Sequence, residues 1–265
     1  MKERIITGVL GAVGFLLLTY LGDWYYTGLM FVLAVLAFLE YANMKQFALT
    51  SLQTVIGVGL ATCFFVSGLM KVHVVPPYAF LQDPYPIMFG LTLYLVLIVL
   101  SRNQFDLFQM AYLFVGAIYI GYGFSYMMQT IWKPNGLAWS LLVILVTWAN
   151  DSGAYFIGKR WGKHKLWPDI SPNKTIEGSL GGVLFGLVMS LIICLVSGLG
   201  GFIFAVGIGL LITIVGQMGD LVESAWKRSV GVKDSGTILP GHGGVLDRFD
   251  SLIFTFIILY LVQVV

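Results

Sequence analysis

The sequence has few charged residues and an almost neutral charge balance. Only 11% of its 265 residues are charged, whereas 58% are hydrophobic, and the formal net charge is +2. So apolar a composition excludes an ordinary soluble domain. The small net charge argues against nucleic-acid binding, because the basic residues are clustered instead of spread over one face. The composition therefore predicts an integral membrane protein.

The sequence has only two cysteines and shows no sign of a cleavable leader. Cys63 and Cys194 both lie within long apolar runs, where a thiol behaves as a small hydrophobic side chain. They indicate neither a disulfide framework nor a metal motif. The N-terminal apolar run has no A-x-A-like cleavage site before Asp23, so we interpret it as a retained span and not as a signal peptide.

Long apolar runs predict an all-α, polytopic membrane bundle. A span needs about 20 apolar residues, and nine runs approach that length: 5–22, 26–44, 54–70, 86–101, 108–129, 137–157, 178–197, 201–223 and 251–265. With residue 1 in the cytoplasm, all lysines and arginines except Lys71 and Lys133 fall in cytoplasmic segments. This asymmetry predicts a cytoplasmic N-terminus and a multi-pass protein of the cell (inner) membrane.

Polarity divides the chain into two predicted parts. Residues 1–135 form scaffold or oligomerisation helices, and residues 136–265 carry the active site, which faces the cytoplasm. Glu40 is the polar exception in the first part, and we expect its carboxylate to snorkel to water or to serve helix packing, in preference to a catalytic role. In the second part Gly178, Gly182 and Gly186 predict close helix packing, which permits a homodimer without requiring one.

Carboxylates occur at helical spacing near the C-terminus. Asp220, Glu223 and Lys227 stand at i, i+3 and i+7, so a helix places them on one face. Asp247 and Asp250 repeat the i, i+3 spacing before the last apolar run. Such oxygen ligands suit Mg²⁺, which commonly bridges to substrate phosphates. The sequence therefore predicts a Mg²⁺ site and leaves open whether a second cation joins it.

A glycine-rich segment lies between these carboxylate pairs. Residues 240–244 read PGHGG, and their backbone N–H groups can approach an anionic oxygen closely. Phosphate is the expected anion, with its remaining charge met by nearby cations: Lys227, Arg228, Lys233 and Arg248. A loop that only sets membrane topology is the alternative, but it requires neither PGHGG nor acids at helical spacing.

Two upstream segments add candidates. Asp151 interrupts the sixth apolar run, where a carboxylate needs a partner or a cavity, and we favour a role in the site over a structural hydrogen bond. In the predicted loop 159–178, Ser171 or Thr175 can cap the next helix, so that its N-terminal amides and Lys174 face an anion. A simple helix cap is the alternative.

These motifs, in this order, resemble the phosphatidate cytidylyltransferase family, also called CDP-diacylglycerol synthases. The resemblance rests on S-x-x-K-R, K-D, P-G-H-G-G and D-R-x-D, which begin at Ser224, Lys233, Pro240 and Asp247. It extends upstream to D-x-G-A-Y-F at Asp151. A further segment, from Ser171 to Gly178, is similar to S-P-K-K-T-x-E-G, except that Asn173 replaces one lysine and leaves Lys174 as the cation.

The resemblance implies that CTP and phosphatidate become CDP-diacylglycerol and pyrophosphate, with Mg²⁺, in phospholipid biosynthesis. Charge neutralisation and alignment dominate such chemistry. We therefore assign Asp220 and Asp247 as primary metal ligands, with Glu223, Asp250 and Asp151 as further ligands or groups that hold them. Lys227 and Arg248 are assigned to catalysis. The remaining substrate contacts are Ser171, Lys174, Thr175, Arg228, His242 and Gly243, besides Asp151.

Three alternatives were weighed against this interpretation. A CTP-dependent polyprenol or phytol kinase also joins a cytidine nucleotide to lipid chemistry, but the complete run from K-R to D-R-x-D argues against it. A CDP-alcohol phosphotransferase should show D-G-x-x-A-R, which the sequence lacks. An ion-coupled transporter usually places its charges near the midplane between repeated halves. Here we find no internal repeat, and the charges gather at one face of one half.

Overall fold

The fold is a helical bundle, as the sequence predicts. The computed structural model describes residues 2–238 and 243–264, with side chains from residue 8 onward. This part of the chain forms α1 (Lys2–Leu21), α2 (Asp23–Met44), α3 (Leu52–Lys71), α4 (Tyr85–Leu100), α5 (Leu107–Ile131), α6 (Gly136–Trp161), α7 (Ile176–Ser197), α8 (Phe202–Ser229) and α9 (Leu246–Leu261). A short 3-10 turn (Ala79–Leu81) precedes α4, and two strands, β1 (Lys165–Trp167) and β2 (Ser171–Thr175), precede α7.

The helices make a multi-pass membrane protein. Six of them are long and apolar enough to cross a membrane: α2, α3, α5, α6, α7 and α8. Large apolar side chains are exposed on these helices, among them Val196 on α7 and Ile203 on α8, at 84% and 86%. Such a surface suits lipid and not water. The count of nine spans and the cytoplasmic N-terminus stay predictions.

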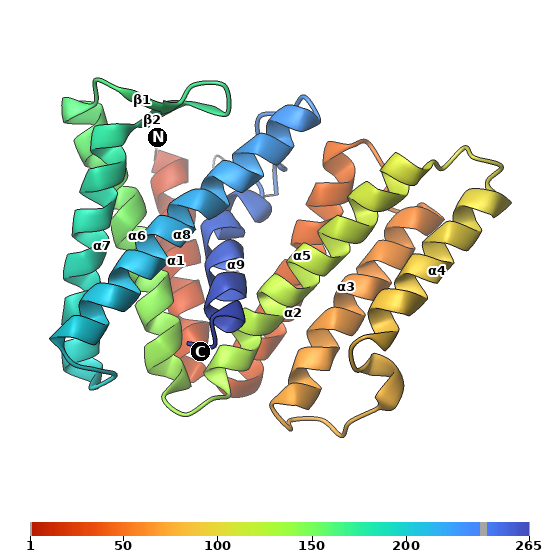
Figure 1. Cartoon of the computed structure of the whole chain (residues 1–265), viewed down its shortest axis with the longest axis horizontal. Helices are drawn as coiled ribbons and strands as arrows, with labels where there is room; N and C mark the ends of the chain where they lie inside the picture. The colour runs from red at the N-terminus through yellow and green to blue at the C-terminus, as the bar shows by residue number, and fades with distance from the viewer. Residues whose placement is uncertain (1, 239–242, 265) are drawn as a thin grey trace. The chain divides into compact units, whose positions relative to one another are not determined.

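The chain forms two compact units. The first comprises Met1–Lys133 and Asp234–Arg248. In it α2, α3 and α5 pack against one another, with α4 against α3 and α5 (Figure 1). Tyr41 of α2 stacks on Tyr112 of α5 with 4.2 Å between ring centroids, and each hydroxyl donates to the other residue's carbonyl. The prediction of a scaffold half and an active half is not tested by this division.

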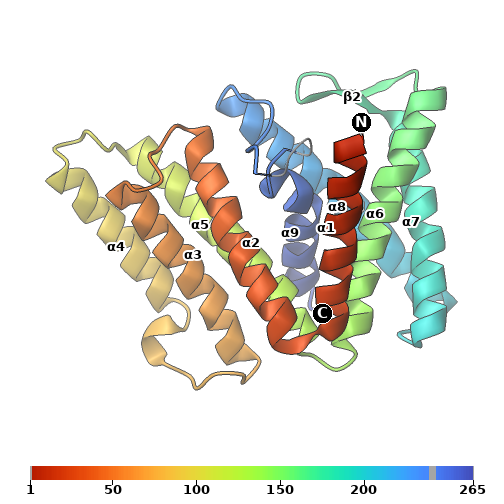
Figure 2. The same cartoon turned by 180° about the vertical axis from the view of Figure 1, so that it is seen from behind.

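The second unit comprises Pro134–Lys233 and Phe249–Val265. In it α6, α7 and α8 pack against one another (Figure 2). The contact between α6 and α7 is close at Gly182, where an added Cβ would lie 2.8 Å from the backbone oxygen of Asn150. The glycine spacing thus serves helix packing within the chain, as the sequence predicts.

The predicted loop 159–178 contains structure that sequence analysis missed. β1 and β2 form an antiparallel hairpin in which Lys165 pairs with Thr175 and Trp167 with Ser171, and it lies at one end of α6 and α7 (Figure 1). The carboxylate of Glu177 accepts from the backbone N–H of Lys163 at 3.1 Å and lies 2.6 Å from the His164 ring. Such short strands carry no alternating apolar pattern, so the prediction of an irregular loop was wrong here.

Candidate active site

The second unit contains a cavity of about 440 Å³ beneath the hairpin. Its size falls within the range of about 300–1,000 Å³ that is typical of small-molecule sites. α6 contributes Asp151 and Lys159, β2 contributes Lys174 and Thr175, and α8 contributes Asp220. The remaining lining residues are Asn150, Ala154, Tyr155, Gly158, Leu166, Asn173, Gly178, Ser179 and Gln217. Charges of both signs therefore meet around one concave space.

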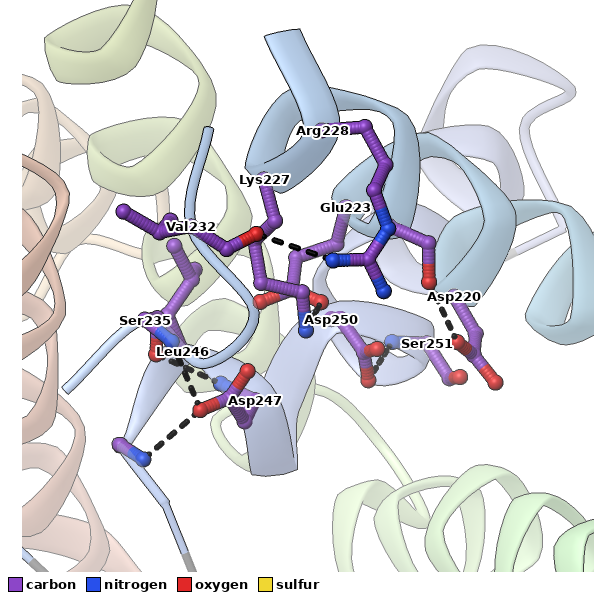
Figure 3. Close-up of polar contacts among 12 residues, drawn as sticks. Asp220, Glu223, Lys227, Arg228, Val232, Ser235, Leu246, Asp247, Asp250 and Ser251 are labelled. Atoms are coloured by element: carbon purple, nitrogen blue, oxygen red, sulfur yellow. Dashed lines mark hydrogen bonds and ion pairs between the residues drawn. The ribbon is translucent and has the colours of Figure 1, made fainter. Parts of the chain in front are cut away.

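Two residues that line this cavity form an ion pair. Lys174 Nζ lies 2.5 Å from Asp220 Oδ2, and the hydroxyl of Ser224 donates to Asp220 Oδ1 at 3.4 Å (Figure 3). Both charged side chains are half-buried. The structure thus brings together a predicted phosphate-binding lysine and a predicted metal-binding aspartate. An anionic ligand in the cavity would compete with Asp220 for Lys174.

A polar network joins the three helices that line the cavity. Gln217 on α8 donates to Asn150 Oδ1 on α6 at 2.8 Å and to the carbonyl of Ser179 on α7 at 3.1 Å. The Ser179 hydroxyl donates back to Gln217, and Asn150 donates to Asp151 Oδ1 at 3.2 Å. These bonds satisfy polar groups inside an apolar bundle. Sequence analysis passed over Gln217 and Ser179; a glutamine three residues before Asp220 in an apolar run was the available signal.

Thr175 is the helix cap that the sequence predicts. Its hydroxyl accepts from the backbone N–H of Gly178 at 3.1 Å, at the N-terminus of α7. Thr175 also lines the cavity, so the cap and the predicted anion-facing position coincide. Ser171, the other predicted cap, lies on β2 and not among the lining residues.

A second ion pair lies further along α8. Asp220, Glu223 and Lys227 occupy one helix, as their spacing predicts, and Lys227 forms an ion pair with Glu223 four residues earlier. The Glu223 side chain is only 2% exposed, so this lysine compensates a buried negative charge. The guanidinium of Arg228, close by on the same helix, donates to the carbonyl of Val232 at 3.0 Å (Figure 3).

Carboxylates converge on Asp250 of α9. Asp250 is buried, and Asp220, Glu223 and Asp151 lie close enough to repel its charge. α9 approaches α8 closely here, since a Cβ added at Gly219 would lie 3.0 Å from the Asp250 backbone oxygen. This concentration of negative charge favours a bound cation.

Carboxylate oxygens are the ligands that Mg²⁺ prefers, but the described side chains are not arranged as a ligand shell. Within residues 2–238 and 243–264, no three His, Cys, Asp or Glu side chains form a ready-made metal site. Asp220 and Glu223 are instead engaged by Lys174 and Lys227. A hard cation would bind in place of these lysine contacts.

Asp247 belongs to the first unit, where it holds a loop. Its Oδ2 accepts from the backbone N–H of Ser235 at 2.9 Å and of Gly244 at 2.8 Å (Figure 3). Gly243 adopts φ of +81°, and a Cβ there would lie 2.6 Å from Asp247 Oδ2. Arg248 is exposed at the start of α9. His242, a predicted substrate contact, lies outside the described residues.

Glu40 does not snorkel to water, so that part of the sequence prediction was wrong. It is 4% exposed on α2, and its Oε2 accepts from the backbone N–H of Leu246 at 3.0 Å. No sequence pattern indicates this partner, because the two residues are 206 positions apart.

The chain resembles known proteins over nearly its whole length. A family model described as "Cytidylyltransferase family" matches residues 2–265. A "Phosphatidate cytidylyltransferase" of Bacillus subtilis is 41% identical, with 98% of this chain and 96% of the relative covered. Proteins of the same name from Staphylococcus epidermidis and Staphylococcus aureus are each 37% identical, with 96% of this chain and 95% of each relative covered.

Proposed function

Because the chain belongs to the cytidylyltransferase family, we propose that it is a phosphatidate cytidylyltransferase. It converts CTP and phosphatidate into CDP-diacylglycerol and pyrophosphate. The observation that carries this proposal within the fold is the cavity of about 440 Å³ whose wall holds the Lys174–Asp220 ion pair. Such a cavity can accept a phosphate-bearing ligand and compensate its charge.

The reaction requires one bond to form and one to break. A phosphate oxygen of phosphatidate attacks the α-phosphorus of CTP, and the bond from that phosphorus to the bridging oxygen breaks, which releases pyrophosphate. Lys174 and Lys159 on the cavity wall neutralise phosphate charge and orient the triphosphate. The rate enhancement comes from alignment and electrostatic stabilisation, because phosphoryl transfer requires little acid–base catalysis by the protein.

A bound Mg²⁺ is part of the proposal. When bound, it draws electron density from the phosphate oxygens and compensates their charge. In the second unit the residues that would hold it are Asp220, Glu223 and Asp250, which already share one region of negative charge. The assignment of Asp247 as a second primary ligand, and the number of cations, stay predictions.

The proposed placement follows from the lipid substrate. The acyl chains of phosphatidate stay in the bilayer while the headgroup enters the polar cavity, which lies at the hairpin end of α6 and α7. We place this end at the cytoplasmic face of the cell membrane, where CTP is available and where the predicted charge asymmetry puts the basic segments.

Pyrophosphate release by the purified protein tests the proposal. We expect release only when CTP and phosphatidate are both present. Phosphorylation of a polyprenol or phytol by CTP, without pyrophosphate, would replace the proposal with the kinase alternative. Solute or ion uptake into proteoliposomes without any CTP turnover would replace it with the transporter alternative.

A further inference from the structure

Glu40 is a buried carboxylate for which the proposed reaction has no role. It lies one turn before the C-terminal end of α2 and is 4% exposed. Its Oε2 accepts from the backbone N–H of Leu246 at 3.0 Å. The hydroxyl of Ser235 lies 3.5 Å from the same oxygen, at the limit of a hydrogen bond. Burying a carboxylate is costly, so these contacts indicate a specific task.

The partners of Glu40 lie after α8 in the chain. Ser235 belongs to the connection between α8 and α9, and Leu246 is the first residue of α9. The first N–H groups of a helix lack partners within the helix. Here Glu40 accepts from Leu246, and the Ser235 hydroxyl accepts from the N–H of Asp247 at 3.3 Å. Glu40 is therefore a cap for α9 that comes from a distant part of the chain. A negative charge at this position is stabilised by the partial positive charge at the N-terminus of the helix.

The same contacts fix the orientation of Asp247. Its Oδ2 accepts from the N–H groups of Ser235 and Gly244, so both sides of the loop hold one carboxylate oxygen (Figure 3). Ser235 contacts both acids, because its hydroxyl faces Glu40 and its N–H faces Asp247. A shift of Glu40 is thus transmitted to Asp247 through a single residue.

Glycines let the loop close on the Glu40 side chain. A Cβ added at Gly236 would lie 2.6 Å from Glu40 Oε1, and its three nearest neighbours are all atoms of Glu40. A Cβ at Gly244 would lie 2.5 Å from Glu40 Oε2. Real Cβ atoms do not approach oxygens so closely, so a side chain at either position would displace the Glu40 carboxylate.

We propose that Glu40 is a positioning residue for nucleotidyl transfer: its carboxylate clamps Ser235 and Leu246 together and thereby orients Asp247. This inference rests on the proposed function and on the prediction that Asp247 is a metal ligand. Glu40 itself touches neither substrate. A residue of α2 thus contributes to the geometry of a predicted metal ligand.

Hydrogen–deuterium exchange tests the clamp without any turnover. In Glu40→Ala, peptides that contain Ser235 and Leu246 should exchange at least about 10-fold faster than in the unaltered protein, because their N–H groups lose the fixed acceptor arrangement. Glu40→Gln keeps an amide oxygen for Leu246 and should preserve most of the protection. Unchanged exchange in Glu40→Ala would overturn the clamp.

Kinetics then test the positioning role. Glu40→Ala should lower kcat by about 100-fold, since misplacement of a group by about 1 Å has effects of that size. The KM for CTP should stay within about 3-fold, and the Mg²⁺ concentration for half-maximal rate should rise, a shift that simple loss of folded protein cannot produce. Glu40→Gln should stay within about 5-fold in kcat. Equal losses in both variants would contradict a role based on hydrogen bonding.

Gly236→Ala supplies an independent test. Its methyl group would displace Glu40, so the single variant should lose activity, whereas Gly236→Ala added to Glu40→Ala should cost less than about 2-fold more. Gly28→Ala on the same helix as Glu40 is the control, because a Cβ there meets nothing within 4 Å. Additive losses in the double variant would overturn the contact.

The clamp and the proposed function fail in different ways. If the unaltered protein makes no CDP-diacylglycerol, the proposed function is wrong, and with it the positioning role, whatever the exchange data show. If the unaltered protein is active and Glu40→Ala keeps full kcat and Mg²⁺ dependence, the function stands and the positioning role is wrong.

Discussion

Lys174 Nζ on β2 lies 2.5 Å from Asp220 Oδ2 on α8. This ion pair joins the hairpin to α8, and both of its members are predicted to bind the substrates or their cation. In the proposed reaction each member of the pair has a ligand that it binds more strongly: phosphate for Lys174 and Mg²⁺ for Asp220. A half-buried pair of this kind contributes little to stability. We therefore expect the pair to separate when CTP and Mg²⁺ bind, with each group turning to its ligand.

Asp220→Asn should abolish turnover while the protein still inserts and purifies. The amide keeps the size of the side chain but removes the negative charge that would hold a cation. Lipid product from radiolabelled CTP is the measurement, and the thermal transition in detergent is the control for folding. Substantial activity in this variant would contradict the assignment of Asp220 as a metal ligand.

Lys174→Ala should raise the KM for CTP by about 10-fold or more, because one charge-assisted phosphate contact is lost. Lys174→Arg keeps the charge and should lose less. Lys165→Ala is the matched control, since Lys165 lies on the same hairpin but does not line the cavity. Initial rates over a range of CTP concentrations provide the comparison. Similar KM values for the Lys174→Ala and Lys165→Ala variants would contradict the assignment of Lys174 as a phosphate contact.

Lys227→Met should destabilise the protein by about 3–5 kcal/mol, because it leaves the buried Glu223 carboxylate without its main counter-charge. Adding Glu223→Gln should recover most of the lost stability but not the activity. Lys71→Met is the control, since the Lys71–Asp83 pair is partly exposed, at 46% and 34%, and should matter by less than about 1 kcal/mol. Denaturant titrations in detergent measure these differences. An equal effect of the Lys227 and Lys71 changes would contradict the buried-pair interpretation.

Gly182→Ala should destabilise the second unit by about 1–3 kcal/mol, because the methyl group would have to force α7 away from the backbone of α6. Gly207→Ala on α8 should be neutral or slightly stabilising, since a Cβ there meets nothing within 4 Å and alanine favours a helix. Thermal transitions of the two variants can be compared directly. A Gly182→Ala protein as stable as Gly207→Ala would contradict the close packing at this position.

The helices were predictable because apolar runs of membrane length leave the backbone few alternatives. Local spacing was also informative: it put Asp220, Glu223 and Lys227 on one helix and named Thr175 as one of two candidate caps. These features depend on residues within a few positions of one another. The confirmed part of the prediction is therefore local.

The contacts that build the site were less accessible from sequence. Glu40 and Leu246 are 206 positions apart. Lys174 reaches Asp220 from a hairpin that no apolar pattern predicts. Gln217 was not among the predicted site residues, and only the fold places it beside Asn150 and Ser179. Tertiary packing decides such pairs, and spacing along the chain does not encode them.

The most direct test of the central claim compares CTP labelled with ³²P at the α- or at the γ-phosphate. Purified protein is incubated with phosphatidate and Mg²⁺, and the chloroform-soluble product is counted, with a sample lacking Mg²⁺ beside it. We predict that α-label enters the lipid in a Mg²⁺-dependent manner, while γ-label leaves as pyrophosphate. Lipid that carries the γ-label, or active folded protein that transfers neither label, would contradict the proposed cytidylyl transfer.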